Sequence, residues 1–258
     1  MRYPFSAVLL AALTTEALGH YNFEALIVNG VITKAYEYVR RTTNGWSPIA
    51  DVDSQDMVCN EGGLDSETMT NTQTYKVKPG DEVGFTVNIE IGHPGPLAVY
   101  MSRAPDGTKA NAYKGDGDWF KAYALTTRGV DESGIHWGNY PDGIAIRNFT
   151  FTLPKDLPSG DYLMRAEHIG LHDASQYAKA QIYIGCAQIT VEGSGSGSPS
   201  PTVKIPGVYD GYETGILIDL NEPHSSYTAP GPKTWPNGCE DATVNQPGEP
   251  NDGDCTGA

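Results

Sequence analysis

The chain places an apolar side chain at every second position of Val83-Gly84-Phe85-Thr86-Val87-Asn88-Ile89-Glu90-Ile91. A period of two is that of a β-strand with one face in a core and the other toward solvent. Shorter runs of the same kind occupy residues 24–28, 97–101, 147–153, 161–168, 180–184 and 188–191. Seven alternating runs in one chain predict an all-β sandwich.

Long segments separate these runs. Residues 32–72 and 102–146 are rich in Gly, Asp, Asn and aromatic residues, and long loops of this kind commonly carry function. Residues 193–201 have the Gly-, Ser- and Pro-rich composition of a linker. The apolar residues that follow are too few for a second domain but need a core. We therefore interpret 193–201 as a surface loop of one domain, residues 20–235, and residues 236–258 as a polar tail.

Residues 1–19 have the features of a secretory signal peptide. Arg2 precedes an apolar run over residues 5–13, and the small residues Ala17 and Gly19 stand before a cleavage point. The run of nine apolar residues is well short of the roughly 20 that a membrane-spanning helix needs. We therefore expect a secreted, extracellular protein that begins, once processed, at His20.

The charge balance limits the possible partners. The chain has 17 Lys and Arg against 32 Asp and Glu, a formal net charge of −15. Such acidity opposes binding to nucleic acid and to anionic membranes, but it permits a neutral polymer such as a polysaccharide. We expect neither a nucleic acid nor a membrane as partner, and we expect a monomer.

Four cysteines in an exported chain predict two disulfides. Three connectivities are possible, and the spacing favours Cys59 with Cys186 and Cys239 with Cys255. The single N-glycosylation sequon has Asn148 as its acceptor and lies in an alternating run.

Cleavage before His20 would create a free α-amine and an imidazole on one residue, and the two can chelate one metal ion. His93 could add a second imidazole. It follows the strongest strand pattern, and Pro94 and Pro96 stiffen its backbone. Three nitrogen ligands suit tetragonal Cu(II). The alternative is that His20 only marks the cleavage point and that His93 belongs to an ordinary turn.

Gln181 and Tyr183 belong to a predicted strand that runs into Cys186. Alternation places their side chains on one face, about 6.6 Å apart along the strand. Tyr183 could be a partly buried tyrosine with a satisfied hydroxyl. It could also present its phenol oxygen to a metal, with the Gln181 amide near the oxygen co-substrate.

Five segments, in order along most of the processed chain, carry a resemblance. They are His20, His-Pro-Gly-Pro at 93–96, Arg-Ala-Glu-His-Ile-Gly-Leu-His at 165–172, Gln-Ile-Tyr-Ile-Gly-Cys at 181–186 and Ser-Tyr-Thr-Ala-Pro-Gly-Pro at 226–232. The chain resembles the lytic polysaccharide monooxygenases of auxiliary activity family nine, which are secreted fungal copper enzymes.

The resemblance implies one copper ion per chain, held by the amine and Nδ1 of His20, by Nε2 of His93 and axially by Tyr183. It implies catalytic roles for His172, Gln181 and Tyr183 at the copper site. It also implies a disulfide between Cys59 and Cys186. Two departures from the usual pattern, His168 and Gly170, leave His168 either as a bystander or as a local hydrogen-bond partner.

The resemblance further implies an immunoglobulin-like or fibronectin-like antiparallel β-sandwich whose long loops form a flat active face, with Tyr227 binding substrate. The expected reaction is oxidative cleavage of β-1,4 bonds in cellulose or a related β-glucan, at C1 or C4. The co-substrates would be an external electron donor and O2 or H2O2. His136 and His224 match no motif, and we assign them no role.

Two other functions fit parts of the sequence. A secreted copper-binding protein without oxygenase activity would also need His20, but it would not need Tyr227. An endo-β-1,4-glucanase would use paired carboxylates, for which Asp116 with Asp118 and residues 51–53 are candidates.

Overall fold

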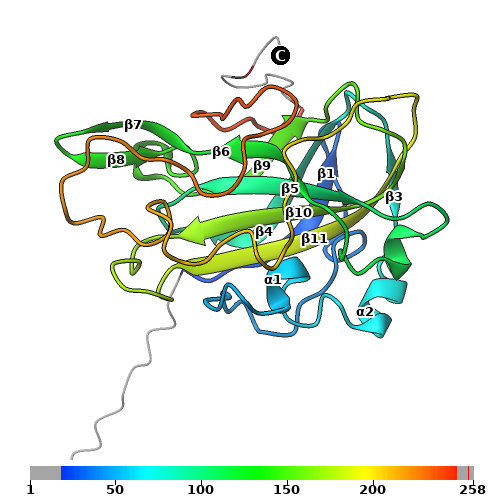
Figure 1. Cartoon of the computed structure of the whole chain (residues 1–258), viewed down its shortest axis with the longest axis horizontal. Helices are drawn as coiled ribbons and strands as arrows, with labels where there is room; N and C mark the ends of the chain where they lie inside the picture. The colour runs from blue at the N-terminus through cyan, green and yellow to red at the C-terminus, as the bar shows by residue number, and fades with distance from the viewer. Residues whose placement is uncertain (1–18, 249–254, 256–258) are drawn as a thin grey trace, which may run out of the picture.

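Two β-sheets pack face to face in the computed structural model, which describes residues 19–248 and Cys255 (Figure 1). One sheet has the strand order β2-β1-β4-β9 and the other β3-β11-β10-β5-β6, while β7 and β8 form a separate hairpin. The strands are β1 (Phe23–Val28), β2 (Val31–Ile32), β3 (Tyr75–Val77), β4 (Glu82–Ile91), β5 (Leu97–Arg103), β6 (Phe120–Leu125), β7 (Thr127–Asp131), β8 (Gly134–Trp137), β9 (Ile146–Thr152), β10 (Gly160–Gly170) and β11 (Gln181–Val191). Pairing is antiparallel except between β3 and β11. The predicted all-β sandwich is confirmed.

An apolar core fills the space between the sheets. The alternating residues Val83, Phe85 and Val87 of β4 enter it as the sequence pattern predicts. Ile89 departs from the pattern and is only half-buried. The reason is local, because the pairing of β4 with β9 is irregular between Thr86 and the end of the strand.

Strands β10 and β11 are buried on both faces. A second apolar cluster covers their outer face, and it includes residues of α1 (Asp56–Cys59) and of the segment 203–227. Double burial explains why the sequence pattern divides β11 into two pieces. Residues 185–187, Gly-Cys-Ala, are buried within the strand but do not alternate in polarity.

The two long segments contain elements that the alternation does not predict. Residues 32–72 carry α1 and α2 (Ser66–Asn71), and residues 102–146 carry β6, β7, β8 and 3-10 turns at Ala110–Ala112 and Pro141–Gly143. In β6, Lys121 is 1% exposed and its Nζ donates to the carbonyl oxygen of Pro230 at 2.7 Å. Because a buried lysine interrupts the alternation of apolar residues, the sequence pattern does not predict this strand.

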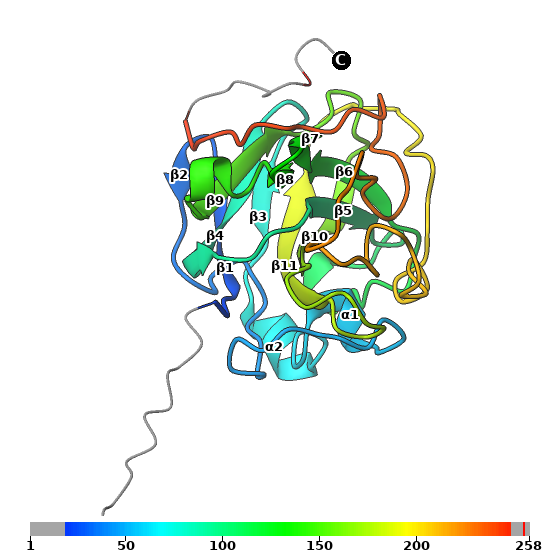
Figure 2. The same ribbon diagram turned by 90° about the vertical axis from the view of Figure 1, so that its left-hand side faces the viewer.

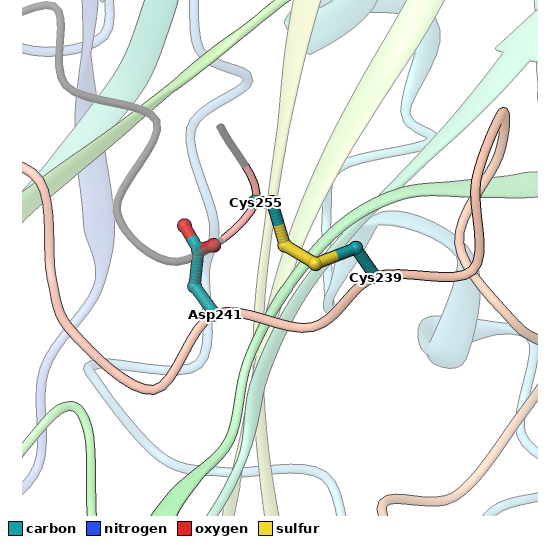
Figure 3. Close-up of side chains that lie close together, drawn as sticks. All are labelled: Cys239, Asp241 and Cys255. Carbon is teal, nitrogen blue, oxygen red and sulfur yellow. A yellow bond between two sulfur atoms is a disulfide. The ribbon is translucent and has the colours of Figure 1, made fainter. Parts of the chain in front are cut away.

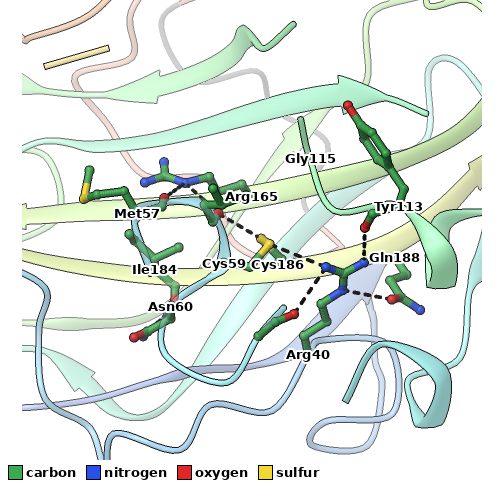
Figure 4. The surroundings of a disulfide bond; sticks show 12 residues. Arg40, Met57, Cys59, Asn60, Tyr113, Gly115, Arg165, Ile184, Cys186 and Gln188 are labelled. Carbon is green, nitrogen blue, oxygen red and sulfur yellow. Dashed lines mark hydrogen bonds between the residues drawn. A yellow bond between two sulfur atoms is a disulfide. The ribbon is translucent and has the colours of Figure 1, made fainter. Parts of the chain in front are cut away.

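Both disulfides join the cysteines that the spacing favours. Cys59 and Cys186 tie α1 to β11, and two buried arginines lie beside this bond (Figure 4). Arg165 Nε donates to the Met57 carbonyl oxygen at 2.9 Å, and Arg40 donates to carbonyl oxygens of the surrounding loops. The arginines thus satisfy the backbone of the loops that the disulfide holds.

The second disulfide joins Cys239 to Cys255, and Asp241 lies next to it (Figure 3). Both sulfur atoms are bonded to each other, so this group does not offer two thiolates to a metal ion. Asp241 also forms a β-bridge with Leu125 of β6. The second disulfide therefore closes a segment that lies against the sheet.

The linker-like residues 193–201 lie against the sandwich. Gly195 forms a β-bridge with Pro158, and Gly197 lies beside Trp235. The chain continues beyond Trp235 along the sandwich, where Asn245 bridges to Thr150 of β9. Residues 1–18 of the predicted signal peptide, and residues 249–254 and 256–258 of the predicted tail, lie outside the described residues. Within the described part, no helix is long and apolar enough to cross a membrane.

Candidate metal centre

The sheet topology brings the predicted site residues to one end of the sandwich. Because β1 and β4 are antiparallel, His20 before β1 lies near His93 after β4. In the same way, His172 after β10 lies near Gln181 at the start of β11. This end faces the viewer in Figure 2, where the β7–β8 hairpin lies above the loop that joins β10 to β11.

Three rings form a triangle at this end. The ring centroids of His20 and His93 are 6.2 Å apart, those of His20 and Tyr183 are 6.1 Å apart, and those of His93 and Tyr183 are 5.8 Å apart. His172 extends the cluster, since its ring stacks on His93 with centroids 3.9 Å apart and planes 16° apart. The predicted ligands and one predicted catalytic residue are therefore neighbours.

The His93 ring has a buried nitrogen that faces the residue before the predicted cleavage point. Gly19 lies against Nε2 of His93 in the unprocessed chain, so cleavage before His20 would uncover this nitrogen. Burial, with smaller contributions from His172 and His20, lowers the pKa of His93 to about 4. The imidazole is therefore neutral near neutral pH, as a metal ligand must be.

The loop that carries His93 packs tightly against the end of β10. Leu171 N donates to Pro94 O at 2.8 Å, and Ile169 N donates to Pro96 O at 3.1 Å. Gly95 has a φ of 148°, and a Cβ there would lie 1.8 Å from the carbonyl oxygen of Ile169. Only glycine allows this close approach.

Tyr183 and Gln181 do share a face of β11, and they contact each other. The Tyr183 hydroxyl donates to Gln181 Oε1 at 2.6 Å. Tyr183 is 1% exposed, and burial raises its pKa, so its oxygen stays a neutral phenol. The hydroxyl is satisfied, and the ring nevertheless borders both histidines of the triangle.

His168 proves to be a local hydrogen-bond partner. It is fully buried on β10 directly opposite Tyr183. Its Nδ1 bonds to the hydroxyl of Tyr21, and its Nε2 bonds to Asn139 Nδ2 at 3.1 Å. Burial lowers the pKa of His168 to about 3, which keeps the ring neutral. No sequence motif includes Tyr21 or Asn139. Only the position of Tyr21, directly after His20, could have drawn attention to it.

Tyr227 lies apart from the histidine triangle, and within the described part of the chain its contacts are to other segments. It is half-buried, its hydroxyl donates to Gly215 O at 2.8 Å, and its ring meets the edge of Trp137 with centroids 4.6 Å apart. Part of this side chain is therefore used to hold its own segment. Asn148 is half-buried on β9 opposite Thr86, so its glycosylation stays a prediction.

The remaining histidines and carboxylates make ordinary surface contacts. His136 pairs with Asp131 at 2.9 Å in the β7–β8 hairpin, and His224 Nε2 lies 2.8 Å from a backbone oxygen. Asp118 pairs with Lys204 at 3.0 Å, and both side chains are more than half exposed. The other candidate carboxylates, Asp51, Asp53 and Asp116, are exposed as well, as is typical of charged residues in surface loops.

The chain is similar to known proteins over most of its length. The family model described as Auxiliary Activity family 9 (formerly GH61) matches residues 20–228. The AA9 family lytic polysaccharide monooxygenase H of Malbranchea cinnamomea is 44% identical over 230 residues, which cover 88% of this chain and 96% of that protein. The corresponding enzyme C of Emericella nidulans is 45% identical, covering 87% and 95%. The solved structure of HiLPMO9B is similar with a TM-score of 0.71 at 25% identity, and the match covers 84% of this chain and 99% of that one.

Proposed function

The chain belongs to Auxiliary Activity family 9 and is a copper-dependent lytic polysaccharide monooxygenase, and we propose that its substrate is cellulose or a related β-1,4-glucan. In this proposal the enzyme hydroxylates C1 or C4 of the glucan with electrons from an external donor and with O2 or H2O2. It acts as a secreted, extracellular monomer after removal of residues 1–19, with residues 20–235 as the catalytic domain and residues 236–258 as a C-terminal extension.

The observation that carries the proposal is the ring triangle of His20, His93 and Tyr183. His93 Nε2 is buried beneath Gly19, so removal of residues 1–19 would free this nitrogen to bind a metal ion. After cleavage His20 would add an amine and an imidazole, which completes the three-nitrogen set that suits Cu(II). Tyr183 would present its oxygen to the metal ion as a neutral phenol. These donors fit one copper ion per chain.

The residues around the triangle would orient the reactants. A bound copper ion supplies one-electron and oxygen chemistry that side chains lack. Because Gln181 Oε1 accepts the Tyr183 hydroxyl, its amide nitrogen is the end left to donate to the oxygen co-substrate. His172 stacks on His93 and is partly exposed, so it would also help to position the co-substrate.

Two properties of the molecule support a neutral glucan as substrate. The formal net charge of −15 opposes binding to polyanions but not to an uncharged polymer. Tyr227 lies on a long surface segment and retains partial exposure for contact with a sugar ring. We assign it to substrate binding.

Copper titration of two N-terminal forms tests the metal site. Gly19 lies against the imidazole of His93, since a Cβ on it would be 2.5 Å from Cε1. A chain that keeps Gly19 would therefore cover His93 and would carry an amide in place of the amine. We expect calorimetry to show one tight site in the form that begins at His20, and binding weaker by orders of magnitude in the form that begins at Gly19. Equal affinities would contradict the assignment of His20.

Product analysis tests the reaction and separates it from the alternatives. Cellulose is incubated with the copper-loaded protein, with and without ascorbate, and the products are examined by mass spectrometry. We expect oxidised oligosaccharides only with the reductant. Cleavage without reductant would indicate the endoglucanase, and tight copper binding without cleavage would indicate the copper-binding protein.

A further inference from the structure

Three buried polar side chains form one hydrogen-bonded chain behind the ring triangle. Tyr21, His168 and Asn139, here called the His168 network, are 1%, 0% and 0% exposed. Tyr21 bonds to Nδ1 of His168, and Asn139 bonds to Nε2. Both nitrogens of the central ring are therefore engaged by side chains from distant parts of the chain.

The two ends of the network touch the segments that carry the proposed ligands. Tyr21 directly follows His20, and its ring stacks on Tyr183 with centroids 4.3 Å apart and planes 19° apart. At the other end, Asn139 Nδ2 also donates to the carbonyl oxygen of His93 at 3.1 Å. The network therefore bonds to the backbone of His93, includes the residue next to His20 and packs on the ring of Tyr183.

The fold itself does not require polar residues here. His168 lies on the face of β10 that also carries Ala166 and Met164, both apolar and fully buried in the core between the sheets. A buried polar group left without a partner costs about 1–3 kcal/mol. An apolar residue at position 168 could form the same strand without the free-energy cost of an unpaired polar group. Strand formation therefore does not explain why these three residues are polar.

Backbone contacts hold the His93 loop only in part. The carbonyl oxygens of Pro94 and Pro96 accept hydrogen bonds from the end of β10. The side chain of Asn139 adds a hydrogen bond to the backbone of His93 itself. The network can therefore fix the orientation of His93, whereas the bonds to Pro94 and Pro96 fix the rest of the loop.

We propose that the His168 network positions the imidazoles of His20 and His93 relative to each other before copper binds. This inference rests on the proposed copper function. Tyr21, His168 and Asn139 act through the ligand segments and do not touch the metal. Partners of this kind commonly change metal affinity by about 10 to 100-fold when removed. We expect an effect of that size.

The test replaces the whole network by apolar residues in the form that begins at His20. In the variant Tyr21→Phe/His168→Leu/Asn139→Leu, the three side chains that bond to one another are removed together, and only the His93 carbonyl oxygen loses a partner that is not itself replaced. The copper-free protein should therefore still fold, with its unfolding temperature lowered by about 2–10 °C. We expect the copper dissociation constant to rise about 10 to 100-fold. The electron paramagnetic resonance spectrum of Cu(II) should also change in its parallel hyperfine coupling.

Tyr162→Phe provides the matched control. Tyr162 is 1% exposed on the same strand, and its hydroxyl donates to Pro158 O at 2.9 Å, at the end of β10 away from the histidines. Losing this partly buried hydrogen bond should leave both the copper affinity and the spectrum as in wild type. A matching change in the control would mean that any lost core hydrogen bond disturbs the site, which would overturn the proposal.

Wild-type affinity together with a wild-type spectrum in the triple variant would also overturn it. If the triple variant does not fold, Asn139→Ala carries the test, because it releases only the bond to His93 and one bond to His168. An unchanged affinity and spectrum in that variant would reject the proposal. Absence of copper binding in the wild-type protein would instead reject the proposed function.

Discussion

The side-chain amide of Gln181 has an oxygen that accepts and a nitrogen that donates, and the structure gives the oxygen a partner. Its oxygen accepts the Tyr183 hydroxyl at 2.6 Å. We expect Gln181→Leu, which keeps the volume but removes the donor, to lower oxidised-product formation by about 10 to 1,000-fold, the effect of deleting one positioned donor to a developing charge. Copper affinity should stay within a few fold, because no ligand is removed. The rates are compared at a fixed concentration of added peroxide.

Tyr183→Phe tests whether a loss in Gln181→Leu comes from the amide itself or from the contact between Gln181 and Tyr183. It removes the hydroxyl that holds Gln181, and with it the phenol oxygen proposed to face the copper ion, but it keeps the amide; copper affinity is therefore measured for this variant too. If product formation depends on the amide, Tyr183→Phe should be impaired less than Gln181→Leu. Equal rates in Gln181→Leu and wild type would remove the catalytic role from Gln181 while leaving its place on β11 unchanged.

The segment of residues 203–235 has no regular secondary structure, but buried contacts fix it to the sheet. Tyr209 donates to Glu167 Oε1 at 2.6 Å, and Lys121 of β6 donates to Pro230 O. Burial raises the pKa of Tyr209 well above its ordinary value, so this hydroxyl remains a donor. The segment is therefore a rigid support for Tyr227.

Substitution of Tyr227 tests the substrate role at this scale. We expect Tyr227→Ala to weaken binding to crystalline cellulose severalfold, since burying part of an apolar ring face against a sugar contributes roughly 1 kcal/mol at about 25 cal/mol per Å². Tyr227→Phe keeps the ring and loses only the bond to Gly215, so it should bind nearly as wild type. Pull-down on cellulose measures both. A changed Cu(II) spectrum in Tyr227→Ala would show that the residue supports the metal centre instead.

The two disulfides constrain the whole molecule to different extents. Cys59 and Cys186 are 127 residues apart in sequence, whereas Cys239 and Cys255 are 16 apart. Removing a crosslink restores entropy to the unfolded chain, and the restored entropy increases with the length of the closed loop. The chain-entropy relation gives a difference of about 2 kcal/mol between these two loops.

Paired alanine variants measure this difference. Cys59→Ala/Cys186→Ala should lower the free energy of unfolding by about 2 kcal/mol more than Cys239→Ala/Cys255→Ala does. Denaturant titration of both copper-free variants gives the two values. A smaller loss from the longer loop would mean that packing around the bonds, and not chain entropy, sets their contribution.

The sequence by itself determined the parts of this protein that depend on local order. Alternation over residues 83–91 predicted β4, because a strand exposes successive side chains to opposite faces. The same rule placed Gln181 and Tyr183 on one face of β11. His20 and His93 were identified by their positions along the chain, at a predicted cleavage point and just after a strand. None of these inferences needs knowledge of a contact with a distant residue.

Only the tertiary structure decided which distant side chains meet. Tyr21 and His168 are 147 positions apart, and Lys121 and Pro230 are 109 apart. Their hydrogen bonds leave no periodic pattern, because each depends on the order of strands in the sheets and on which loops cover them. The same holds for the half-buried position of Tyr227 and for residues 236–245, which lie against the strands despite their polar composition. The sequence alone does not show whether a polar side chain is exposed or buried, because burial requires a hydrogen-bond partner that can come from any distant part of the fold.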